Sequence, residues 1–536
     1  MRVTSRETLS SRSEFFQRGR LVVISVASVL ALAACGGGGG GGGSGDGGGA
    51  QQPPPSPPPP ANVAPTVQAG TDQTIELPVN SANLSGSATD DSSTSTLTYT
   101  WSATSGPSGV TFGTANAAAT TVTFPSAGNY VLTLTVSDGS ANGTDTVAVT
   151  VNAPMYPESD AANTDIDNHG WVRVAAAADV GMDQALLEQA ATYASTSGTV
   201  NASDNAGMIV RHGRIVHSWG SIDKRYDLKS TTKSMGGIAL GLAFQDGLLT
   251  DLDATAQTYL PTMGTNPASN NTTWLSQITL HQLATHSAGF LKEAGYNLPA
   301  PNQANPTLIH APGTTWEYSD GGLNWLSETL TAVFGQDLAT VLNDEVWTVL
   351  GVNSTTGPGG TAPATSDIQW RDNAQRPQGG TIPHNRELAS GIFANSNAMA
   401  RVGLLFLRDG VWANDRRLLP ESFIDTVRTP PPANAALINP NEAEFPQATT
   451  NYGVLWWTNA TGLLPNVPRD AYWAWGLGDS VIVVIPSLDI VAVRAGAQAA
   501  ANSSLGTRVW NDDDWNGDYS VLAPFLDPIV QSVTTP

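Results

Sequence analysis

The sequence predicts a multidomain protein in which an all-β sandwich is followed by an α/β domain with an antiparallel sheet and a helical region. Residues 62–152 alternate apolar and polar residues between clusters of Gly, Ser, Asn and Asp, which is typical of short strands joined by turns. Across residues 155–536, stretches with strand periodicity enclose stretches with helical periodicity. A chain of 536 residues is also too long for one core of ordinary size, so more than one folded unit is expected.

The first 35 residues have the composition of an export signal. An apolar run at residues 21–34 follows the basic residues Arg12, Arg18 and Arg20, and it is too short to span a bilayer comfortably. It leads into Leu32-Ala33-Ala34-Cys35, which resembles the lipobox of bacterial lipoproteins, where the cysteine becomes the lipidated first residue of the mature protein. The alternative is a chance cysteine in an ordinary secretory signal.

Residues 36–61 form a tether, in which a Gly-rich coil precedes a Pro-rich spacer. Gly36, in place of an aspartate directly after the cysteine, resembles outer-membrane sorting in Gram-negative bacteria. We therefore expect a lipid-anchored protein of the bacterial cell envelope, at the outer membrane or on its periplasmic or extracellular face, without a spanning helix. Cys35 is the only cysteine, so no disulfide can form within one chain.

The charge of the chain argues against nucleic acid as a partner. The formal net charge is −22, and no Lys or Arg occurs between Arg20 and Arg173. Nothing in that stretch can hold a phosphate backbone or an anionic lipid surface. Contact with a membrane is therefore expected through the lipid anchor only, and the sequence leaves the oligomeric state open.

The segment at residues 62–152 has the spacing of about seven short strands, carried by stretches such as "TLTYTWSA", "ATTVTFPS" and "DTVAVTVN". "NVAPTVQAG", "LTYTWSATSGP" and "YVLTLTVSDG" together resemble PKD-type and related immunoglobulin-like modules of bacterial surface proteins. The resemblance implies that Trp101 and Tyr130 are core residues. The alternative is a sugar-binding platform built around Trp101.

In the second domain, "AGMIVRHGRIVHSWG" predicts a β-hairpin that turns at His212-Gly213, and "NYGVLWW", "SVIVVIP" and "DIVAVRAG" predict strands near the C-terminus. Helical stretches between them include "SMGGIALGLAFQDG", "NWLSETLTAVFG" and "NAMARVGLLFLRDG". Strands at both ends of a helical middle suggest an α/β sandwich whose first and last segments share one sheet.

Two Ser-x-x-Lys pairs are candidates for a nucleophile and its base: Ser230 with Lys233, and Ser221 with Lys224. The pair works chemically on the first turn of a helix, because residues i and i+3 then lie on one face within hydrogen-bond reach. Ser230 precedes an apolar helical pattern, whereas Ser221 lies in the turn-like stretch "WGSIDKRYD". We therefore favour Ser230, although on spacing alone a capping serine and a structural lysine remain the alternative.

A serine at a helix N-terminus lies beside backbone N–H groups that suit a developing oxyanion. A lysine has an ordinary pKa of about 10.4, so it acts as a base near neutrality only if burial or a nearby positive charge lowers that pKa. Lys229 is a candidate source of that charge.

Three further stretches extend the pattern: "ITLHQLATHSAGF", "APGTTWEYSDGGLNWLSETL" and "LASGIFANSNAMARVGLLFLRDG". Together with the Ser-x-x-Lys pair they resemble the serine β-lactamase and penicillin-binding protein superfamily over roughly residues 200–500. The similarity is to its class C-like branch of esterases, D-amino-acid peptidases and 6-aminohexanoate-dimer hydrolases. It implies that Ser230 is the nucleophile, Lys233 the general base and Tyr318 the second acid/base. We interpret His286 and His384 as structural.

Two positions depart from the family pattern. Asp320 stands where the family usually has Asn, and its carboxylate near Lys233 would favour the protonated lysine. The third motif, usually Lys-Thr-Gly or His-x-Gly, is Ala474-Trp475-Gly476, so carboxylate recognition by its first position is lost. By the resemblance, the backbone N–H groups of Ser230 and Leu477 form the oxyanion hole, with Trp475 and Gly476 beside the substrate.

Aromatic residues are concentrated in the last strands. Trp456, Trp457, Tyr472, Trp473 and Trp475 either line an apolar acyl pocket or belong to the core, and the sequence does not decide between the two.

The signal-like N-terminus predicts export, and the resemblance implies a serine hydrolase that cleaves an ester, amide or peptide bond of a small molecule through an acyl-enzyme, without a cofactor or metal. The alternative is a non-catalytic or weakly catalytic surface binding protein of the same fold.

Overall fold

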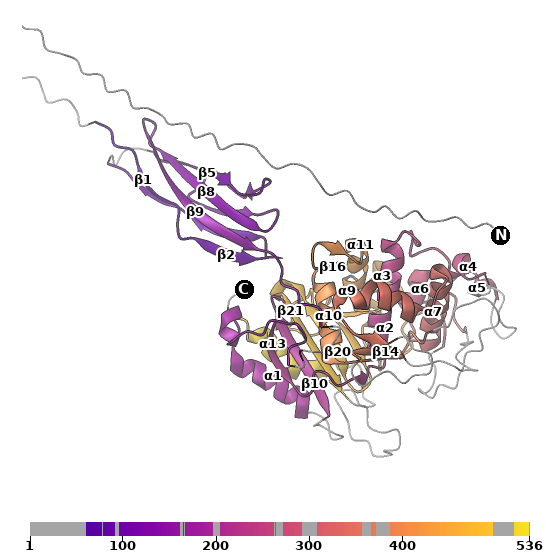
Figure 1. Ribbon diagram of the computed structural model, residues 1–536. Coiled ribbons are helices and arrows are strands. Elements are labelled where there is room, and N and C mark those ends of the chain that lie inside the picture. Colours follow the sequence, from indigo (N-terminus) through magenta and orange to yellow (C-terminus); the bar gives the residue numbers. More distant parts are fainter. Residues whose placement is uncertain are drawn as a thin grey trace, which may run out of the picture. The chain divides into compact units, whose positions relative to one another are not determined.

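The computed structural model describes residues 61–77, 79–91, 96–160, 165, 167–196, 204–261, 263, 272–291, 308–355, 366–370, 386–496 and 519–534 (Figure 1). The predicted signal, Cys35, the tether up to residue 60, and His384 lie outside these residues. Within the described ranges, no helix is long and apolar enough to cross a membrane.

The N-terminal domain is a β-sandwich with nine described strands where about seven were predicted. These are β1 (Thr66–Gln68), β2 (Gln73–Glu76), β3 (Ser81–Ser85), β4 (Ser87–Thr89), β5 (Thr98–Ser105), β6 (Thr111–Phe112), β7 (Ala119–Thr123), β8 (Gly128–Ser137) and β9 (Asn142–Asn152). One sheet has the order β2-β9-β8-β5 and the other β3-β7-β6, while β1 and β4 form a separate pair. The short strands β1, β4 and β6 are additional to the clearly alternating stretches.

The alternation of buried and exposed residues along the strands shows where the core of this domain lies. In β8 the inward positions Tyr130, Leu132, Leu134 and Val136 are buried, while the residues between them are partly exposed. Trp101 of β5 is 3% exposed, and its indole N–H donates to the carbonyl of Ala117 at 3.1 Å. Trp101 and Tyr130 are therefore core residues, and a sugar-binding platform on Trp101 is wrong because the indole is buried within the sandwich.

The second domain is built on a six-stranded antiparallel sheet of order β11-β10-β21-β20-β19-β18. Its strands are β10 (Asn205–Arg211), β11 (Arg214–Trp219), β18 (Trp457–Thr458), β19 (Tyr472–Gly476), β20 (Ser480–Ile485) and β21 (Ile490–Gly496). Because β10 pairs with β21, the first and last segments share one sheet, as predicted. The β10–β11 hairpin turns at His212 and Gly213, whose φ angles of 52° and 68° suit a tight hairpin turn.

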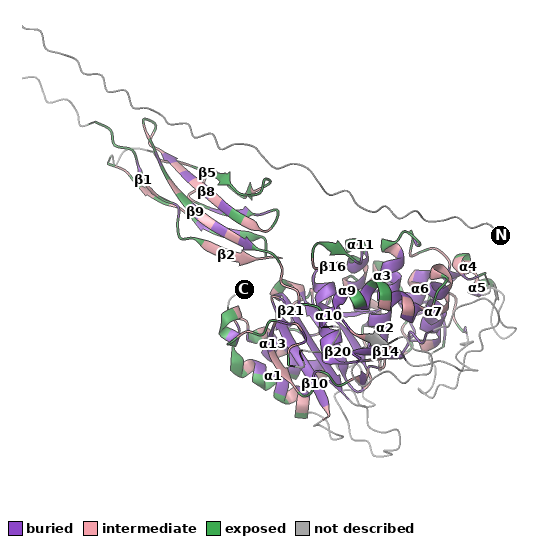
Figure 2. Cartoon of the chain, viewed as in Figure 1, coloured by how far each residue is buried: buried purple, intermediate pink, exposed green. Residues whose placement is uncertain are grey.

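Both faces of this sheet are covered (Figure 2). On one face, α10 (Ser396–Leu407) packs on β20 and β21, and Ile482 and Val484 of β20 point toward it. On the other, α1 (Gln184–Thr196) and α13 (Ala523–Gln531) lie side by side over Val483 and Ile485 (Figure 1). The sheet is therefore apolar on both sides, which explains why its strands are continuous hydrophobic runs.

The remaining elements form the helical region and its connections. They are η1 (Ala177–Val180), β12 (Tyr226–Asp227), α2 (Thr231–Gly236), α3 (Ile238–Gln245), α4 (Ala256–Tyr259), α5 (Thr272–Leu275), α6 (Leu280–Ala284), α7 (Asp320–Phe334), α8 (Leu338–Leu342), η3 (Asn343–Trp347), α9 (Thr348–Leu350), β13 (Ser354–Thr355), β14 (Ile368–Trp370), β15 (Ile392–Ala394), β16 (Val411–Trp412), β17 (Arg416–Arg417), α11 (Glu421–Arg428), η4 (Pro432–Ala436), α12 (Ala448–Asn451), η5 (Pro486–Leu488) and η6 (Tyr519–Leu522). A smaller sheet has the order β12-β15-β14-β13.

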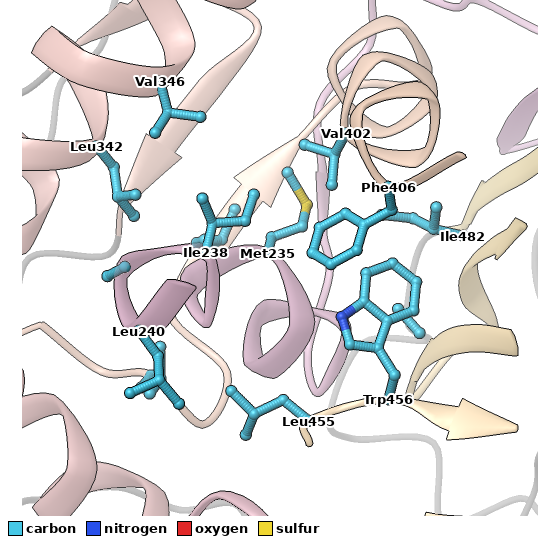
Figure 3. Close-up of a cluster of buried hydrophobic side chains, with 14 of the residues drawn as sticks. Met235, Ile238, Leu240, Leu342, Val346, Val402, Phe406, Leu455, Trp456 and Ile482 are labelled. Atoms are coloured by element: carbon cyan, nitrogen blue, oxygen red, sulfur yellow. The ribbon is translucent and has the colours of Figure 1, made fainter. Parts of the chain in front are cut away.

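The short helix α2 lies between the large sheet and the helical region. Met235 of α2 and Ile238 of α3 are buried in one cluster with Phe406, Trp456 and Ile482, which come from α10, the segment before β18, and β20 (Figure 3). Full burial of each such side chain contributes about 1.5–3 kcal/mol. This packing fixes the start of α2, where Ser230 lies, relative to the sheet.

Candidate active site

Ser230 and Lys233 lie at the start of α2. Ser230 directly precedes the first helical residue, and its Oγ is 3.0 Å from the Nζ of Lys233. Both residues are buried, at 3% and 2% exposure. The helix begins here because the backbone N–H groups of Thr231 and Thr232 bond to the carbonyls of Leu228 and Lys229. The structure therefore brings the pair together on one helical turn, where the spacing placed it.

The second Ser-x-x-Lys pair has none of this geometry. Ser221 is exposed in a turn, and the side chain of Lys224 is 48% exposed and pairs with Asp204. Lys229 is also engaged elsewhere, because its ammonium donates to Asp227 at 2.6 Å. The expectation that Lys229 acts on Lys233 is therefore not supported: its charge is balanced by a carboxylate two residues away.

The ammonium of Lys233 has three oxygen acceptors around it. Besides Ser230 Oγ, it donates to Asp320 Oδ1 at 2.7 Å and to the carbonyl of Ala389 at 2.9 Å. Three acceptors match the three N–H donors of a protonated lysine. Asp320 therefore lies beside Lys233, as its place in the Tyr-x-Asn motif indicated, and the resting pair is an ion pair.

Asp320 is held in this position by the start of α7. It is the first residue of that helix, and the hydroxyl of Ser319 accepts a hydrogen bond from the backbone N–H of Gly322 at 3.2 Å. An acidic residue in the first turn interacts favourably with the helix dipole. The side chain of Asp320 is 18% exposed, so this end of the site is the more open one.

Tyr318 lies between two rings. Its phenol stacks on His286, with ring centroids 4.3 Å apart, and on Phe445, with centroids 5.0 Å apart. The Nζ of Lys233 is 4.7 Å from the phenol centroid. Burial raises the pKa of Tyr318 well above its ordinary value, Asp320 raises it further, and a hydrogen bond with Ser230 opposes the rise. Tyr318 is therefore a neutral phenol in the resting site.

His286 supports the segment that carries Tyr318. Its Nδ1 accepts a hydrogen bond from the backbone N–H of Ser319 at 3.1 Å, and its carbonyl accepts from Glu317 at 2.8 Å. Burial lowers the pKa of this imidazole well below its ordinary value, and the charge of Lys233 acts in the same direction. His286 is therefore neutral with its proton on Nε2, and its backbone contacts are those of a structural residue.

The hairpin that joins β19 and β20 closes the other side of the site. A Cβ atom added to Gly476 would lie 2.0 Å from the carbonyl oxygen of Leu228 and 2.9 Å from the backbone nitrogen of Thr231. Only glycine allows the strand to approach the start of α2 so closely. The same approach brings the backbone of Gly476 and Leu477 to the residues that flank Ser230.

Trp475 does not lie where the sequence prediction placed it. Its indole is 4% exposed, donates to Asp479 Oδ1 at 3.1 Å and packs 6.2 Å from the ring of Tyr519. Successive residues of a strand point to opposite faces of a sheet, and Trp475 points to the face covered by the C-terminal helix. Its side chain is therefore part of the core, and a role in contacting substrate is wrong.

Four of the five aromatic residues of the last strands belong to the core and not to an acyl pocket. Trp456 and Tyr472 pack against Phe406 of α10, while Trp473 joins Trp475 against Tyr519. Trp457 also packs against Tyr519, with ring centroids 5.8 Å apart, but its ring stacks in addition on Phe445, which itself stacks on Tyr318.

Several functional contacts were missed by the sequence prediction. Ala389 accepts from Lys233 through its backbone carbonyl, which no side-chain pattern reveals. Phe445 and Tyr452 complete the aromatic surroundings of Tyr318 and His286. The available signal for Phe445 was an aromatic residue alone in the polar stretch "NPNEAEFPQATT".

Both domains match known protein families. A family model described as Beta-lactamase matches residues 162–510, which is more than half of the chain. The chain belongs to the beta-lactamase family. A second model, described as a PKD domain, matches residues 69–151. In this beta-lactamase-family chain, the PKD domain therefore precedes the domain that holds Ser230, and the resemblance to both families is confirmed.

Individual relatives are distant or partial. The mouse Dyslexia-associated protein KIAA0319-like protein is 44% identical over 78 residues, which is 14% of this chain, and the chain spans 7% of the length of that relative. Simvastatin synthase (LovD) from Aspergillus terreus has 17% identity and a TM-score of 0.46, covering 65% of this chain and 98% of its own. A penicillin-binding protein homologue from Caulobacter crescentus has 15% identity and a TM-score of 0.42, covering 61% and 94%.

Proposed function

We propose that this protein is an exported serine hydrolase that cleaves an ester or amide bond through an acyl-enzyme on Ser230. The observation that carries the proposal is the buried contact of 3.0 Å between Ser230 Oγ and Lys233 Nζ, beside a neutral Tyr318 that shares a hydrogen bond with the same serine. The direct test is covalent labelling of the protein by a fluorophosphonate probe, which reacts with an activated serine.

In the proposed mechanism, Lys233 in its neutral form takes the proton of Ser230 as Oγ attacks the carbonyl carbon. The carbonyl oxygen becomes an oxyanion and accepts hydrogen bonds from the backbone N–H groups of Ser230 and Leu477. Tyr318 donates its phenolic proton to the leaving group and regains one from the lysine. Water then attacks the acyl-enzyme and releases the acid.

Asp320 affects the protonation of Lys233, and therefore the pH at which the proposed mechanism operates. Lys233 must lose a proton before it can act as a base, and the carboxylate at 2.7 Å opposes that loss by stabilising the ammonium. The family pattern has a neutral asparagine at this position. We therefore propose an enzyme that is most active on the alkaline side of neutrality.

The pH profile of Asp320→Asn tests this role. The variant is expected to shift the rising limb of kcat/KM to lower pH by about one to three units, the range for an opposite charge in contact. Removal of the anion favours deprotonated Lys233, which moves the rising limb to lower pH. It also removes a charge that raises the pKa of Tyr318, and because Tyr318 acts as an acid in this mechanism, the falling limb is expected to move to lower pH as well. The measurement is kcat/KM against pH for both proteins on one ester. An unchanged limb would show that Asp320 does not control the base.

We propose an uncharged substrate with an apolar group. Ala474 replaces the family's cationic residue in the third motif. Arg494 lies on β21, which β20 separates from the strand of Ala474, and its guanidinium donates to backbone carbonyls. Phe445 places an apolar ring beside Tyr318, and Trp457 stacks on Phe445. The third motif therefore has no cationic side chain to bind a substrate carboxylate, and aromatic rings lie near Tyr318.

A lactam comparison tests this specificity. A chromogenic cephalosporin is expected to have a kcat/KM roughly ten- to a hundred-fold below that of a short-chain nitrophenyl ester, because a charge-assisted hydrogen bond of about 1.5–3 kcal/mol to the carboxylate is absent. Both rates are measured on the same preparation. A lactam rate equal to the ester rate would sink the idea and require another group to hold the carboxylate.

We also propose that Cys35 is lipidated and anchors the protein in the cell envelope. The support is the lipobox-like sequence after an apolar run, followed by the Gly- and Pro-rich tether. Detergent partitioning of the wild-type protein against Cys35→Ala is the measurement, and equal partitioning would rule out the anchor.

The alternative function is a non-catalytic binding protein. It is motivated by the ion pair of Lys233 with Asp320, which opposes the base role of the lysine. Labelling by the fluorophosphonate probe distinguishes the hydrolase from the binding protein.

A further inference from the structure

A buried arginine lies behind the turn that joins β19 and β20. Arg494 of β21 is 3% exposed, and its Nη1 donates to the carbonyls of Gly478 at 2.9 Å and Asp479 at 2.8 Å. Its Nε donates to the carbonyl of Ala194 at the end of α1, at 2.9 Å. One rigid guanidinium therefore ties the turn to the helix on the far face of the sheet.

This turn determines the direction of the Leu477 N–H group. The carbonyl of Gly476 accepts a hydrogen bond from the backbone N–H of Asp479 at 2.9 Å, so it points into the turn. A trans peptide is planar, with its carbonyl and N–H pointing in opposite directions. The N–H of Leu477 therefore points out of the turn.

The turn needs support to keep this shape. Gly478 and Asp479 have φ angles of 83° and 59°, in the left-handed region that an aspartate adopts only occasionally. The two carbonyls that Arg494 holds belong to these same residues. The carboxylate of Asp479 is fully buried and accepts from the indole of Trp475. The conformation is thus fixed from behind by the side chains of Arg494 and Trp475.

On its other side the hairpin is attached to the helix that carries Ser230. The hydroxyl of Thr231 donates to the carbonyl of Ser480. Gly476 lies against Leu228 and Thr231, with no room for a Cβ atom. A rotation of the turn is therefore transmitted to the backbone beside the nucleophile.

We propose that Arg494 is a positioning residue for the oxyanion hole. It holds the carbonyls of Gly478 and Asp479 behind the turn, so that the Leu477 N–H, and no carbonyl oxygen, faces the oxyanion that forms at Ser230. A carbonyl in that place would repel the oxyanion, whereas the N–H stabilises it. This inference rests on the proposed acyl-enzyme function.

Arg494→Met and Arg494→Lys are the test variants. Lysine keeps the charge, but its single ammonium lacks the fork by which Arg494 donates from Nη1 to the turn and from Nε to Ala194 at the same time. Loss of one oxyanion donor is expected to lower kcat for a nitrophenyl ester by about a hundred-fold. KM is expected to change little, because the oxyanion exists only after attack. The affinity for phenylboronic acid, which forms a tetrahedral adduct with an active serine, is expected to fall by a similar factor.

The matched control is Arg211, a second buried arginine on the neighbouring strand β10. It is 1% exposed and donates to the carbonyls of Val180 at 2.8 Å, Gly181 at 3.0 Å and Leu488 at 3.2 Å. Arg211 pairs with Ile490, the first residue of β21, whereas Arg494 lies near the other end of that strand. Arg211→Met and Arg211→Lys therefore remove comparable bonds from the sheet without touching the β19–β20 turn.

The expected result is a parallel loss of kcat and boronate affinity in the Arg494 variants and unchanged values in the Arg211 variants, with similar losses of melting temperature. Equal losses of kcat at both arginines, or an unchanged kcat in the Arg494 variants, would overturn the inference. In either case, hydrolysis by the wild-type protein would still uphold the proposed function. A wild-type protein without probe labelling or ester hydrolysis would overturn both. If the methionine variants do not fold, the lysine variants alone give the comparison.

Discussion

Replacement of Ser230 by alanine is expected to abolish hydrolysis, with a loss of at least about 10⁴-fold in kcat for a nitrophenyl ester. In the proposed mechanism Ser230 Oγ forms the acyl-enzyme, and the neighbouring hydroxyls of Thr231 and Thr232 are bonded to the backbone of Ser480 and Ile392. Covalent labelling by a fluorophosphonate probe is expected to disappear in the same variant. Both readouts use the full chain, and circular dichroism confirms that the fold is retained.

The chain carries its own control for this experiment. Ser221→Ala removes the serine of the other Ser-x-x-Lys pair, which lies exposed in a turn near the solvent-exposed Lys224. Activity and labelling are expected to stay within about two-fold of the wild type, since surface substitutions away from a site have small effects. Equal loss in both variants would mean that the wrong pair had been identified.

The constellation of Ser230, Lys233 and Tyr318 was predictable because local sequence determines it. The i, i+3 spacing at the start of a helix predicts the contact of Ser230 with Lys233. The order of the family's motifs along the chain identifies Tyr318. The β10–β11 hairpin was predictable for a similar reason, since His212-Gly213 suits a tight turn between two apolar runs. Each of these features depends on neighbours close in sequence or on a motif that carries its own geometry.

The surroundings of the site were less predictable because they depend on which face of a sheet a residue occupies. A sheet that is covered on both faces has apolar residues at every position, so period-two alternation disappears. Trp456 and Trp457 are therefore indistinguishable in sequence, although one packs on Phe406 of α10 and the other on Phe445 beside Tyr318. Arg494 is a similar case, since its partners are backbone carbonyls.

Asp320 shows how far one substitution within a motif can be interpreted. Its sequence position predicted a carboxylate near Lys233, and the structure has the two groups 2.7 Å apart. The position did not predict that the same lysine also donates to the carbonyl of Ala389. That third acceptor comes from a segment 156 residues away in sequence, and it completes the environment of a protonated lysine.

Lys233→Met is expected to lower kcat/KM by about 10³-fold, because general base catalysis contributes about 10²–10⁴-fold. The variant also breaks an ion pair and leaves the carboxylate of Asp320 without its cation in a largely buried site. A lower melting temperature is therefore expected together with the loss of activity. Lys224→Met, at the exposed pair, is the control, and neither quantity is expected to change there.

The double variant Lys233→Met/Asp320→Asn separates catalysis from stability. Removing the carboxylate together with the lysine leaves no unpaired charge, so the melting temperature is expected to recover most of the loss, which for this partly exposed pair is about 3 kcal/mol or less. Activity is expected to stay at the level of Lys233→Met, because the proton acceptor is still absent. Recovery of activity with stability would instead show that Lys233 acts only by neutralising Asp320, and that another group accepts the proton of Ser230.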